Sequence, residues 1–206
     1  MLNKSPRILL VSATKMEMPD IENLLVDCLI SGVGMVASSH ALTKQLITGK
    51  YDVVVGLGIA GSFNNRFEIG SVVQVVSDHL VELGVEDNGR FVPADEMNLV
   101  ASDEMRFTTE LRLNQLSEAI GITVNRVHGS TDSIQNVIEQ FNPDIESMEG
   151  AAIAYVCKQF GVPWVQIRAI SNKVEPRNKD AWNIPFAIKN LHLEVKRYID
   201  TLVDEA

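Results

Sequence analysis

The segment SMEGAAIAYVCKQFGVPWVQIRAISN, residues 147–172, decides the fold of this chain. A carboxylate, Glu149, opens an alanine-rich run with the composition of a helix, and Gly161 is placed to end that helix in a left-handed C-terminal cap. The apolar run 164–170 that follows is typical of a buried strand. The segment therefore predicts a helix followed directly by a buried strand, as in an α/β fold.

Polar side chains gather at the end of this strand. Arg168, Ser171 and Asn172 lie at or just past its carboxyl end, and Glu149 lies at the start of the preceding helix. Sites in open α/β sheets collect at the carboxyl ends of strands. An acid, a guanidinium, a hydroxyl and an amide are therefore expected to face one crevice. The alternative is a surface helix and a strand with chance polar ends.

Strand-like and helix-like runs alternate along the rest of the chain. We expect strands at residues 7–13, 28–31, 51–55, 71–77, 79–85 and 122–127, and helices at 35–48, 104–120, 133–141 and 181–203. This alternation is typical of an α/β protein with a largely parallel or mixed sheet. Because no repeat, low-complexity run or linker interrupts it, we expect a single domain over residues 1–206.

The composition narrows the classes of function. The chain has 206 residues, 46% of them hydrophobic and 22% charged, which is ordinary for a globular domain. Its net charge of −9 argues against a nucleic-acid partner, which would require a basic face. Without a leader-like segment or a run of roughly 18 apolar residues, we expect a cytoplasmic protein with no membrane partner. Cys28 and Cys157 have no metal-site spacing and are expected to be small buried residues.

Three further features suggest chemistry less specifically. Residues 56–61, GLGIAG, match a dinucleotide-binding pattern by letter, but no helix is expected after them, so the glycines indicate backbone close to a ligand or a tight turn. Glu17, just past the first strand, is a candidate general base or an acid at a helix start. His79 and His128 lack the spacing of a metal site or a nucleophilic triad and are expected to be structural or pocket-lining. We expect no metal and no cofactor.

Taken together, these segments resemble the purine nucleoside phosphorylase and nucleosidase superfamily over nearly the whole chain. The resemblance implies a three-layer α/β/α sandwich around a central mixed, twisted sheet. It also implies a small-molecule purine nucleoside substrate and a homo-oligomer, most simply a dimer. The segments that carry it are residues 13–17, 31–36, 58–61, 69–73 and, above all, MEGAAIA at 148–154 followed by RAISN at 168–172.

The resemblance also implies roles for individual residues. Glu149 matches the glutamate that binds the ribose hydroxyls, and Met148 matches the methionine that packs on the sugar. Glu17 matches the acid that positions and deprotonates the attacking water, and Arg168 matches the arginine that orients both. Ser171 with Asn172 matches the Ser-Asp pair that contacts purine N7 in methylthioadenosine nucleosidases.

Departures from the nucleosidase pattern point to one branch of the superfamily. Asn172 replaces the aspartate, Ser147 replaces a second glutamate, and Ile59 replaces a serine that contacts the water. The run 171–182, SNKVEPRNKDAW, and the run 122–130 resemble instead the futalosine hydrolases of menaquinone biosynthesis, which release hypoxanthine. An amide can hydrogen-bond N7–H and a 6-oxo group but cannot transfer a proton, which suits hypoxanthine, although its flipped form could pair with adenine.

The expected site has two groups of residues. Glu17, Arg168 and Asn172 are the expected catalytic residues. For the carboxylate of futalosine the run after Asn172 supplies three cations, of which Arg177 is the best partner because its guanidinium binds bidentately. The full set of expected substrate contacts is Val33, Ile59, Ala60, Gly61, His128, Gly129, Ser130, Ser147, Met148, Glu149, Ser171 and Arg177.

Three other functions stay open at this point. One is a methylthioadenosine/S-adenosylhomocysteine or aminodeoxyfutalosine nucleosidase that releases adenine. Another is a purine nucleoside phosphorylase, which the carboxylate of Glu17 disfavours because it lies where phosphorylases carry a phosphate-binding loop. The third is a non-catalytic nucleoside-binding module, which would need Glu149 but neither Glu17 nor Arg168.

Overall fold

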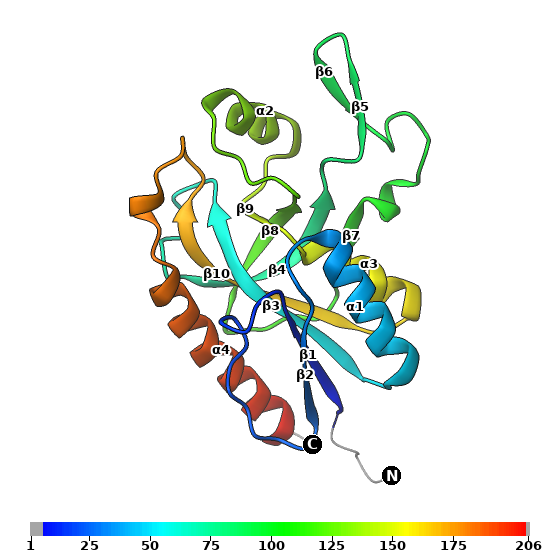
Figure 1. Ribbon diagram of the computed structural model, residues 1–206, viewed down its shortest axis with the longest axis vertical. Helices are drawn as coiled ribbons and strands as arrows, with labels where there is room; N and C mark the ends of the chain where they lie inside the picture. The colour runs from blue at the N-terminus through cyan, green and yellow to red at the C-terminus, as the bar shows by residue number, and fades with distance from the viewer. Residues whose placement is uncertain (1–5, 205–206) are drawn as a thin grey trace.

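The computed structural model describes residues 6–204, and its elements follow the α/β alternation expected from the sequence (Figure 1). The helices are α1 (Met35–Thr48), α2 (Thr131–Phe141), α3 (Gly150–Phe160) and α4 (Ile184–Asp204), with 3-10 turns at Ser102–Glu104 and Lys179–Ala181. The strands are β1 (Ile8–Ser12), β2 (Val26–Ile30), β3 (Val53–Ser62), β4 (Val72–Leu80), β5 (Gly84–Asp87), β6 (Arg90–Pro93), β7 (Arg106–Thr108), β8 (Ser117–Thr123), β9 (Ile145–Ser147) and β10 (Trp164–Lys173).

The main sheet is mixed, and part of it closes on itself. Its order is β10-β4-β8-β9-β3-β1-β2, and β10 also pairs with β3. The pairings β3–β10, β10–β4, β4–β8, β8–β9 and β9–β3 therefore form a ring, from which β1 and β2 extend. The mixed α/β fold and the mixed sheet expected from the sequence are confirmed. The three-layer arrangement of the expected sandwich stays a prediction.

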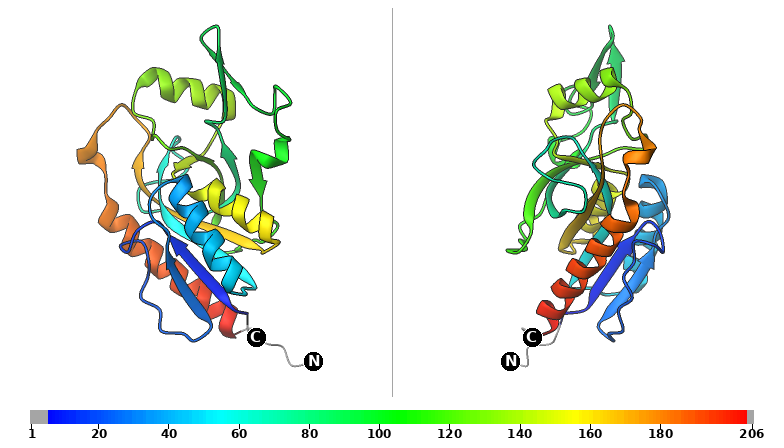
Figure 2. Two further views of the ribbon diagram at one scale, coloured as in Figure 1. Left: turned by 45° about the vertical axis from the view of Figure 1, so that its right-hand side comes forward. Right: turned by 90° about the vertical axis from the view of Figure 1, so that its left-hand side faces the viewer.

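Helix α4 covers one face of the parallel strands β1, β3 and β10, and helices α1 and α3 cover the other face (Figure 2). Strand residues alternate between the faces, so Ile8 and Leu10 pack toward α4 while Leu9 and Val11 pack toward α1 and α3. These strands are apolar on both faces, as expected for parallel strands that are buried twice. Their carboxyl ends are thereby fixed between two packed cores, and the site is built there.

Each of the helices α1 to α4 lies close to a helix that the sequence predicts. The first helix ends at Thr48 before Gly49, and α3 ends before Gly161, which has the expected left-handed conformation (φ 64°). Pro185 lies in the first turn of α4, where its missing N–H removes no helical hydrogen bond. Among residues 6–204, no helix has the length and apolarity needed to cross a membrane.

The helix expected at residues 104–120 is wrong. Strands β7 and β8 lie at its two ends, and the connection between them contains no helix. Met105, Phe107 and Thr109 are buried while the residues between them are exposed, a period of two that fits a strand. The buried Gln74 side chain holds the connection by accepting from Leu113 N–H (2.8 Å) and donating to the Leu111 carbonyl (2.7 Å). These tertiary bonds replace helical ones.

Other boundaries also differ from the expectation. Strand β3 runs on through the glycine segment 56–61 to Ser62, so no turn forms there. The strand expected at 122–127 ends at Thr123, and the one expected at 79–85 is divided between β4 and the separate β5–β6 hairpin. Cys157 is buried as expected, but Cys28 is exposed because β2 is an edge strand of the sheet.

Candidate active site

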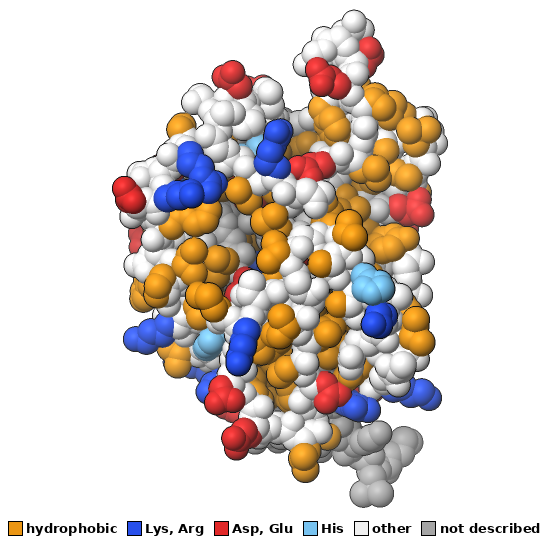
Figure 3. Space-filling view, in the orientation of Figure 1, with side chains coloured by type: hydrophobic (Ala, Val, Ile, Leu, Met, Phe, Trp, Pro, Cys, Tyr) orange, Lys and Arg blue, Asp and Glu red, His pale blue; other side chains and the backbone are white. Residues whose placement is uncertain are grey.

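A cavity of about 230 Å³ opens where β1, β3 and β10 end. The space-filling view shows a hollow on this face, with hydrophobic side chains around acidic atoms (Figure 3). Most of the wall is apolar side chain and backbone, and three carboxylates interrupt it. The lining residues are Ala13, Thr14, Glu17, Val33, Ile59, Ala60, Gly61, Val127, Glu146, Ser147, Met148, Glu149, Ser171, Asn172 and Trp182.

Glu17 is fixed at the end of the cavity nearest β1. It lies in the turn after β1 and is only 7% exposed. Its Oε2 accepts from Thr14 N–H (3.0 Å) and from the Thr14 hydroxyl (2.8 Å), and its Oε1 accepts from Ile59 N–H (3.2 Å). Because three donors hold the carboxylate, its orientation is set before any ligand arrives. No helix begins at this turn, so the reading of Glu17 as a helix-start acid is wrong.

Arg168 lies beside Glu17 over a glycine. A Cβ at Gly58 would collide with Arg168 Nη1 and lie 3.0 Å from Glu17 Oε1, so the absence of a side chain at Gly58 leaves room for both groups. Arg168 is 1% exposed, and its Nη2 has no hydrogen-bond partner among the described residues. A buried guanidinium with a free donor is costly to keep, which is typical of functional sites. The glycine segment therefore serves close packing of the site.

A buried chain of polar groups holds Arg168 from behind. Arg168 Nε donates to Gln166 Oε1 (2.8 Å), and Gln166 Nε2 donates to Asp78 Oδ2 (2.8 Å). The Thr123 hydroxyl donates to Asp78 Oδ1 (2.9 Å) and accepts from Ala151 N–H (2.7 Å) in the first turn of α3. Burial raises the pKa of Asp78, while the bonds from Gln166 and Thr123 and the charge of Arg168 oppose that rise. The chain links the guanidinium to the helix that carries Glu149.

Glu149 lies where the amino ends of two helices meet. It directly precedes α3, and its Oε1 accepts from the N–H of Gly34, the residue before α1 (2.8 Å). Both helix dipoles favour a carboxylate at this point. Burial raises the pKa of Glu149, and the charge of Arg168 and the Gly34 bond oppose that rise. The result is a buried carboxylate with acceptor capacity left for hydroxyl groups.

A bulge in β10 presents Ser171 and Asn172. Ile170 pairs with Ala60 and Asn172 with Gly61, so Ser171 is an extra residue in β10. The Ser171 hydroxyl donates to Asn172 Oδ1 (2.8 Å), and Asn172 Nδ2 donates to the Lys173 carbonyl (2.9 Å). These bonds fix which end of the amide is which. One donor hydrogen and one acceptor lone pair of Asn172 remain for a ligand.

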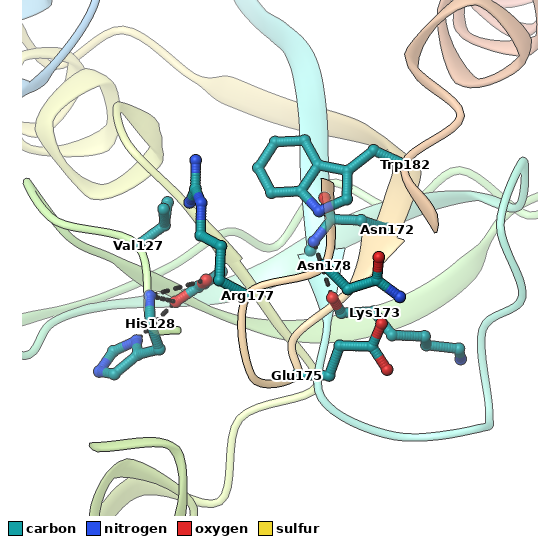
Figure 4. Close-up of a pocket in the computed structure, with 10 residues that line it drawn as sticks. Val127, His128, Asn172, Lys173, Glu175, Arg177, Asn178 and Trp182 are labelled. Atoms are coloured by element: carbon teal, nitrogen blue, oxygen red, sulfur yellow. Dashed lines mark hydrogen bonds and ion pairs between the residues drawn. The ribbon is translucent and has the colours of Figure 1, made fainter. Parts of the chain in front are cut away.

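Glu146 is a cavity residue that the sequence reasoning missed. It lies on β9 and is 4% exposed, and its carboxylate accepts from His128 N–H (3.2 and 3.3 Å) while His128 Nδ1 lies 2.6 Å from its Oε2. It also lines a narrower polar extension of the cavity, in which Figure 4 labels Asn172 and Trp182. The sequence does contain a second acid three residues before Glu149. Because no strand was expected there, the side chain of this acid was not expected to point into the cavity.

The structure brings most of the expected substrate contacts to the cavity and leaves others outside it. Val33, Ile59, Ala60, Gly61, Ser147, Met148, Glu149 and Ser171 line the cavity, with Glu17 and Asn172. His128 lines the polar extension instead, while Gly129 and Ser130 border a separate depression, where the Ser130 hydroxyl caps α2. His79 lines neither the cavity nor its polar extension, and its ring packs edge-on against Phe141. This fits a structural role, one of the two roles expected from the sequence.

The cations after Asn172 differ in position. Lys173 is held by the loop after β3, since its ammonium donates to the carbonyls of Asn64 and Phe67 (both 2.7 Å), and Figure 4 shows it pointing away from Arg177. Arg177 is exposed and lines the polar extension, with its guanidinium carbon 5.3 Å from the centre of the Trp182 ring. Of these two cations, Arg177 is therefore the one available to a ligand.

The family model described as the phosphorylase superfamily matches residues 13–203. The chain belongs to the phosphorylase superfamily. The superfamily expected from the residues is thus confirmed, and the match begins at Ala13 in the cavity wall and continues into α4. Every group of the cavity described above lies within the matched range.

Relatives within the phosphorylase superfamily carry more than one name. The chain is 29% identical to a futalosine hydrolase of Acidothermus cellulolyticus over 175 residues, 80% of this chain and 71% of the relative. It is 34% identical to a 5′-methylthioadenosine/S-adenosylhomocysteine nucleosidase of Shewanella oneidensis over 170 residues, 74% of this chain and 70% of the relative. A solved structure of a Helicobacter pylori futalosine hydrolase superposes with a TM-score of 0.76 at 19% identity, covering 98% of this chain and 99% of that one, and so supports the fold.

Proposed function

We propose that this protein is an N-ribosyl hydrolase that cleaves a purine nucleoside with water. The observation that carries the proposal is the position of Glu17, which three donors fix in the cavity wall beside the buried guanidinium of Arg168. A carboxylate held this way can accept a proton from water as the water attacks C1′ of the ribose. Hydrolases are also prominent among its relatives.

A second carboxylate of the cavity, Glu149, is placed to bind the ribose. Glu149 is buried at the meeting point of two helix amino ends and keeps free acceptor positions toward the cavity. Charge-assisted bonds from the 2′ and 3′ hydroxyls would hold the ribosyl ring between Glu149 and Met148. The negative charge also favours the cationic ribosyl ring that develops as the bond to the base breaks.

The lining of the cavity favours water over phosphate. Among the described residues that line it, none is Lys or Arg, while Glu17, Glu146 and Glu149 are acids. Phosphate would need cations or clustered backbone N–H groups close to C1′. Arg168 lies beside Glu17 but is not part of the cavity lining, so the charge balance of the lining supports hydrolysis and disfavours phosphorolysis.

We assign futalosine as the substrate, with hypoxanthine as the released base in menaquinone biosynthesis. Asn172 keeps one donor for a 6-oxo group and one acceptor for N7–H once N7 has taken up a proton from water, but it has no proton of its own to give. Adenine is a poor leaving group without protonation, whereas hypoxanthine departs with hydrogen bonds to its developing charge. A nucleosidase acting on methylthioadenosine, S-adenosylhomocysteine or aminodeoxyfutalosine is the second candidate, because the Shewanella relative carries such a name.

Base release from a panel of nucleosides tests this proposal. Futalosine, aminodeoxyfutalosine, methylthioadenosine and inosine are each incubated with the protein, with and without phosphate, and the free base is measured by chromatography. We expect hypoxanthine from futalosine at a rate that phosphate does not change. Preferred cleavage of methylthioadenosine would transfer the assignment to the second candidate, dependence on phosphate would indicate a phosphorylase, and no release from any nucleoside would leave only a binding module.

Arg177→Ala is expected to raise the KM for futalosine about tenfold with little change for inosine. The benzoate carboxylate lies beyond the ribose 5′ carbon, and the exposed guanidinium of Arg177 is the available cation beside the ring of Trp182, which also lines the main cavity. Steady-state kinetics with both substrates measure the difference, and Lys179→Ala, an exposed cation in the same run, is the control. Equal losses on the two substrates would make Arg177 a structural residue.

We also expect a single domain that assembles as a homo-oligomer, most simply a dimer. Apolar side chains stand exposed beside the mouth of the cavity: Val33 is 58% exposed, Met16 63% and Val36 83%. A second copy packed there would bury them and would add to the wall of the cavity. Light scattering of the purified protein measures the mass, and a monomer with full activity would contradict the expectation.

A further inference from the structure

We propose that Glu146, fixed by His128, reads the six-membered ring of the base and selects a 6-oxopurine over a 6-aminopurine. The inference rests on the proposed function, because it takes the base to lie against Asn172. It adds a specificity-determining residue that the assignment of Glu17, Glu149 and Asn172 does not include.

Glu146 lies next to Asn172, whose side-chain amide is proposed to face the base. A Cβ at Gly61 would lie 3.1 Å from Asn172 Nδ2 and 3.6 Å from Glu146 Cγ, so the two polar side chains flank one point of β3. Both residues line the cavity and its polar extension, and Trp182 lies beside them in each. A purine that meets Asn172 with its N7 and 6-position therefore directs its six-membered ring into the region of Glu146.

Within the described part of the chain, no lysine or arginine pairs with the buried carboxylate of Glu146. Among residues 6–204 its hydrogen bonds come from His128 alone, from the backbone N–H and, in the tautomer that carries hydrogen on Nδ1, from the ring. Two carboxylate oxygens offer about four acceptor positions, so capacity remains on the cavity side. Neither water activation at Glu17 nor the ribose hydroxyls at Glu149 uses this third acid.

The chemistry of the base decides what such an acceptor recognises. A 6-oxopurine carries hydrogen on N1, next to the 6-oxo group, and a carboxylate accepts that hydrogen in a charge-assisted bond. A 6-aminopurine has a bare lone pair on N1, which would face the carboxylate with no hydrogen between them. A buried polar group that loses its partner discriminates strongly, so a preference of about 100-fold or more for the 6-oxo base is expected.

The competing role for Glu146 is purely structural. Its bonds to His128 also anchor the loop after β8, and any loss of that anchor would weaken binding of every purine equally. Glu146→Gln separates the two roles. The amide oxygen can still accept from His128 N–H, while the new amide group can donate to a bare N1. A base-reading role predicts a change in preference, and an anchoring role predicts a uniform loss.

The test measures binding of free hypoxanthine and free adenine by titration calorimetry to the wild-type protein, Glu146→Gln and the control Glu110→Gln. Glu110 is an exposed acid between β7 and β8 that lines neither the cavity nor its polar extension. We expect the wild type and Glu110→Gln to prefer hypoxanthine about 100-fold, and Glu146→Gln to lose or reverse that preference. An unchanged preference in a folded Glu146→Gln protein, or a wild type that prefers adenine, overturns the inference.

A second ligand keeps the test decisive if Glu146→Gln does not fold. The wild-type protein is titrated with 1-methylhypoxanthine, which has no hydrogen on N1, and binding as tight as that of hypoxanthine overturns the inference.

Binding of free bases does not depend on hydrolysis, so the two proposals fail separately. A protein that cleaves no nucleoside yet prefers hypoxanthine through Glu146 would remove the proposed function alone. Cleavage of futalosine with a base preference that ignores Glu146 would remove this inference alone.

Discussion

Glu17→Gln is expected to lower the turnover of the preferred nucleoside by about 100-fold or more while leaving the protein folded and able to bind it. Glutamine has the same shape but cannot accept the proton that the attacking water must lose. Its amide group would also face either the N–H of Ile59 or the two donors of Thr14, so the side chain would lose at least one of its three fixing bonds. Single-turnover base release and calorimetric binding of the nucleoside measure the two effects separately.

A matched change on the same surface loop controls for general effects of removing a charge. Glu22 lies five residues after Glu17 and is exposed, so Glu22→Gln should leave both turnover and binding unchanged. Turnover retained in Glu17→Gln would assign the base to another group. A loss of binding as large as the loss of turnover would mean that Glu17 holds substrate instead of activating water.

The structure of the segment 147–172 could be predicted from the sequence because the residues at its helix start, its helix end and its strand all indicate the same elements. An acid at the helix start, a glycine at its end and an apolar run after it all indicate one helix and one strand, and α3 and β10 have those places. The residues at the strand end follow from the same placement, since the carboxyl ends of parallel strands meet at one edge of the sheet. The clustering of Glu149, Ser171 and Asn172 was therefore predictable.

Features that depend on distant contacts could not be read in this way. Residues 104–120 contain a run of good helix formers, but Gln74 on another strand satisfies the backbone of the connection and keeps it extended. Strand β9 has three residues, too few for a periodic pattern, so the inward direction of Glu146 stayed hidden. The reason for Gly58 is likewise spatial, because it makes room for a side chain 110 residues later in the chain, Arg168.

Arg168 connects the chemistry of the site to the stability of the fold. Burial raises the pKa of both Asp78 and Glu149, and the charge of Arg168 opposes that rise in each, after the bonds from Gln166 and Thr123 in the case of Asp78. Through Gln166, Arg168 is also tied to the hydrogen-bond chain that reaches α3. Removing this one cation should therefore alter the active site and the buried core together.

Arg168→Met is expected to lower the free energy of unfolding by about 3–5 kcal/mol at neutral pH and to abolish turnover. Methionine fills much of the space but leaves Asp78 and Glu149 without the opposing charge, so the pKa of each should rise further. A carboxyl with a higher pKa in the folded than in the unfolded state stabilises the fold at pH values below its unfolded pKa, about 4. That stability is lost as the pH rises toward the folded pKa. The variant should therefore unfold more easily as the pH increases from about 4.5 to 7.5, more steeply than the wild type.

Urea unfolding across that pH range measures the slope, and Arg197→Met is the control. Arg197 is 70% exposed at its side chain and pairs with Glu194 one turn away on α4, so its loss should cost about 1 kcal/mol or less and leave the pH slope unchanged. A slope in Arg168→Met equal to that of the wild type would mean that Asp78 and Glu149 do not feel the guanidinium. In that case the charge of Arg168 would act on Glu17 and the attacking water alone, and the hydrogen-bond chain through Gln166 would only position it.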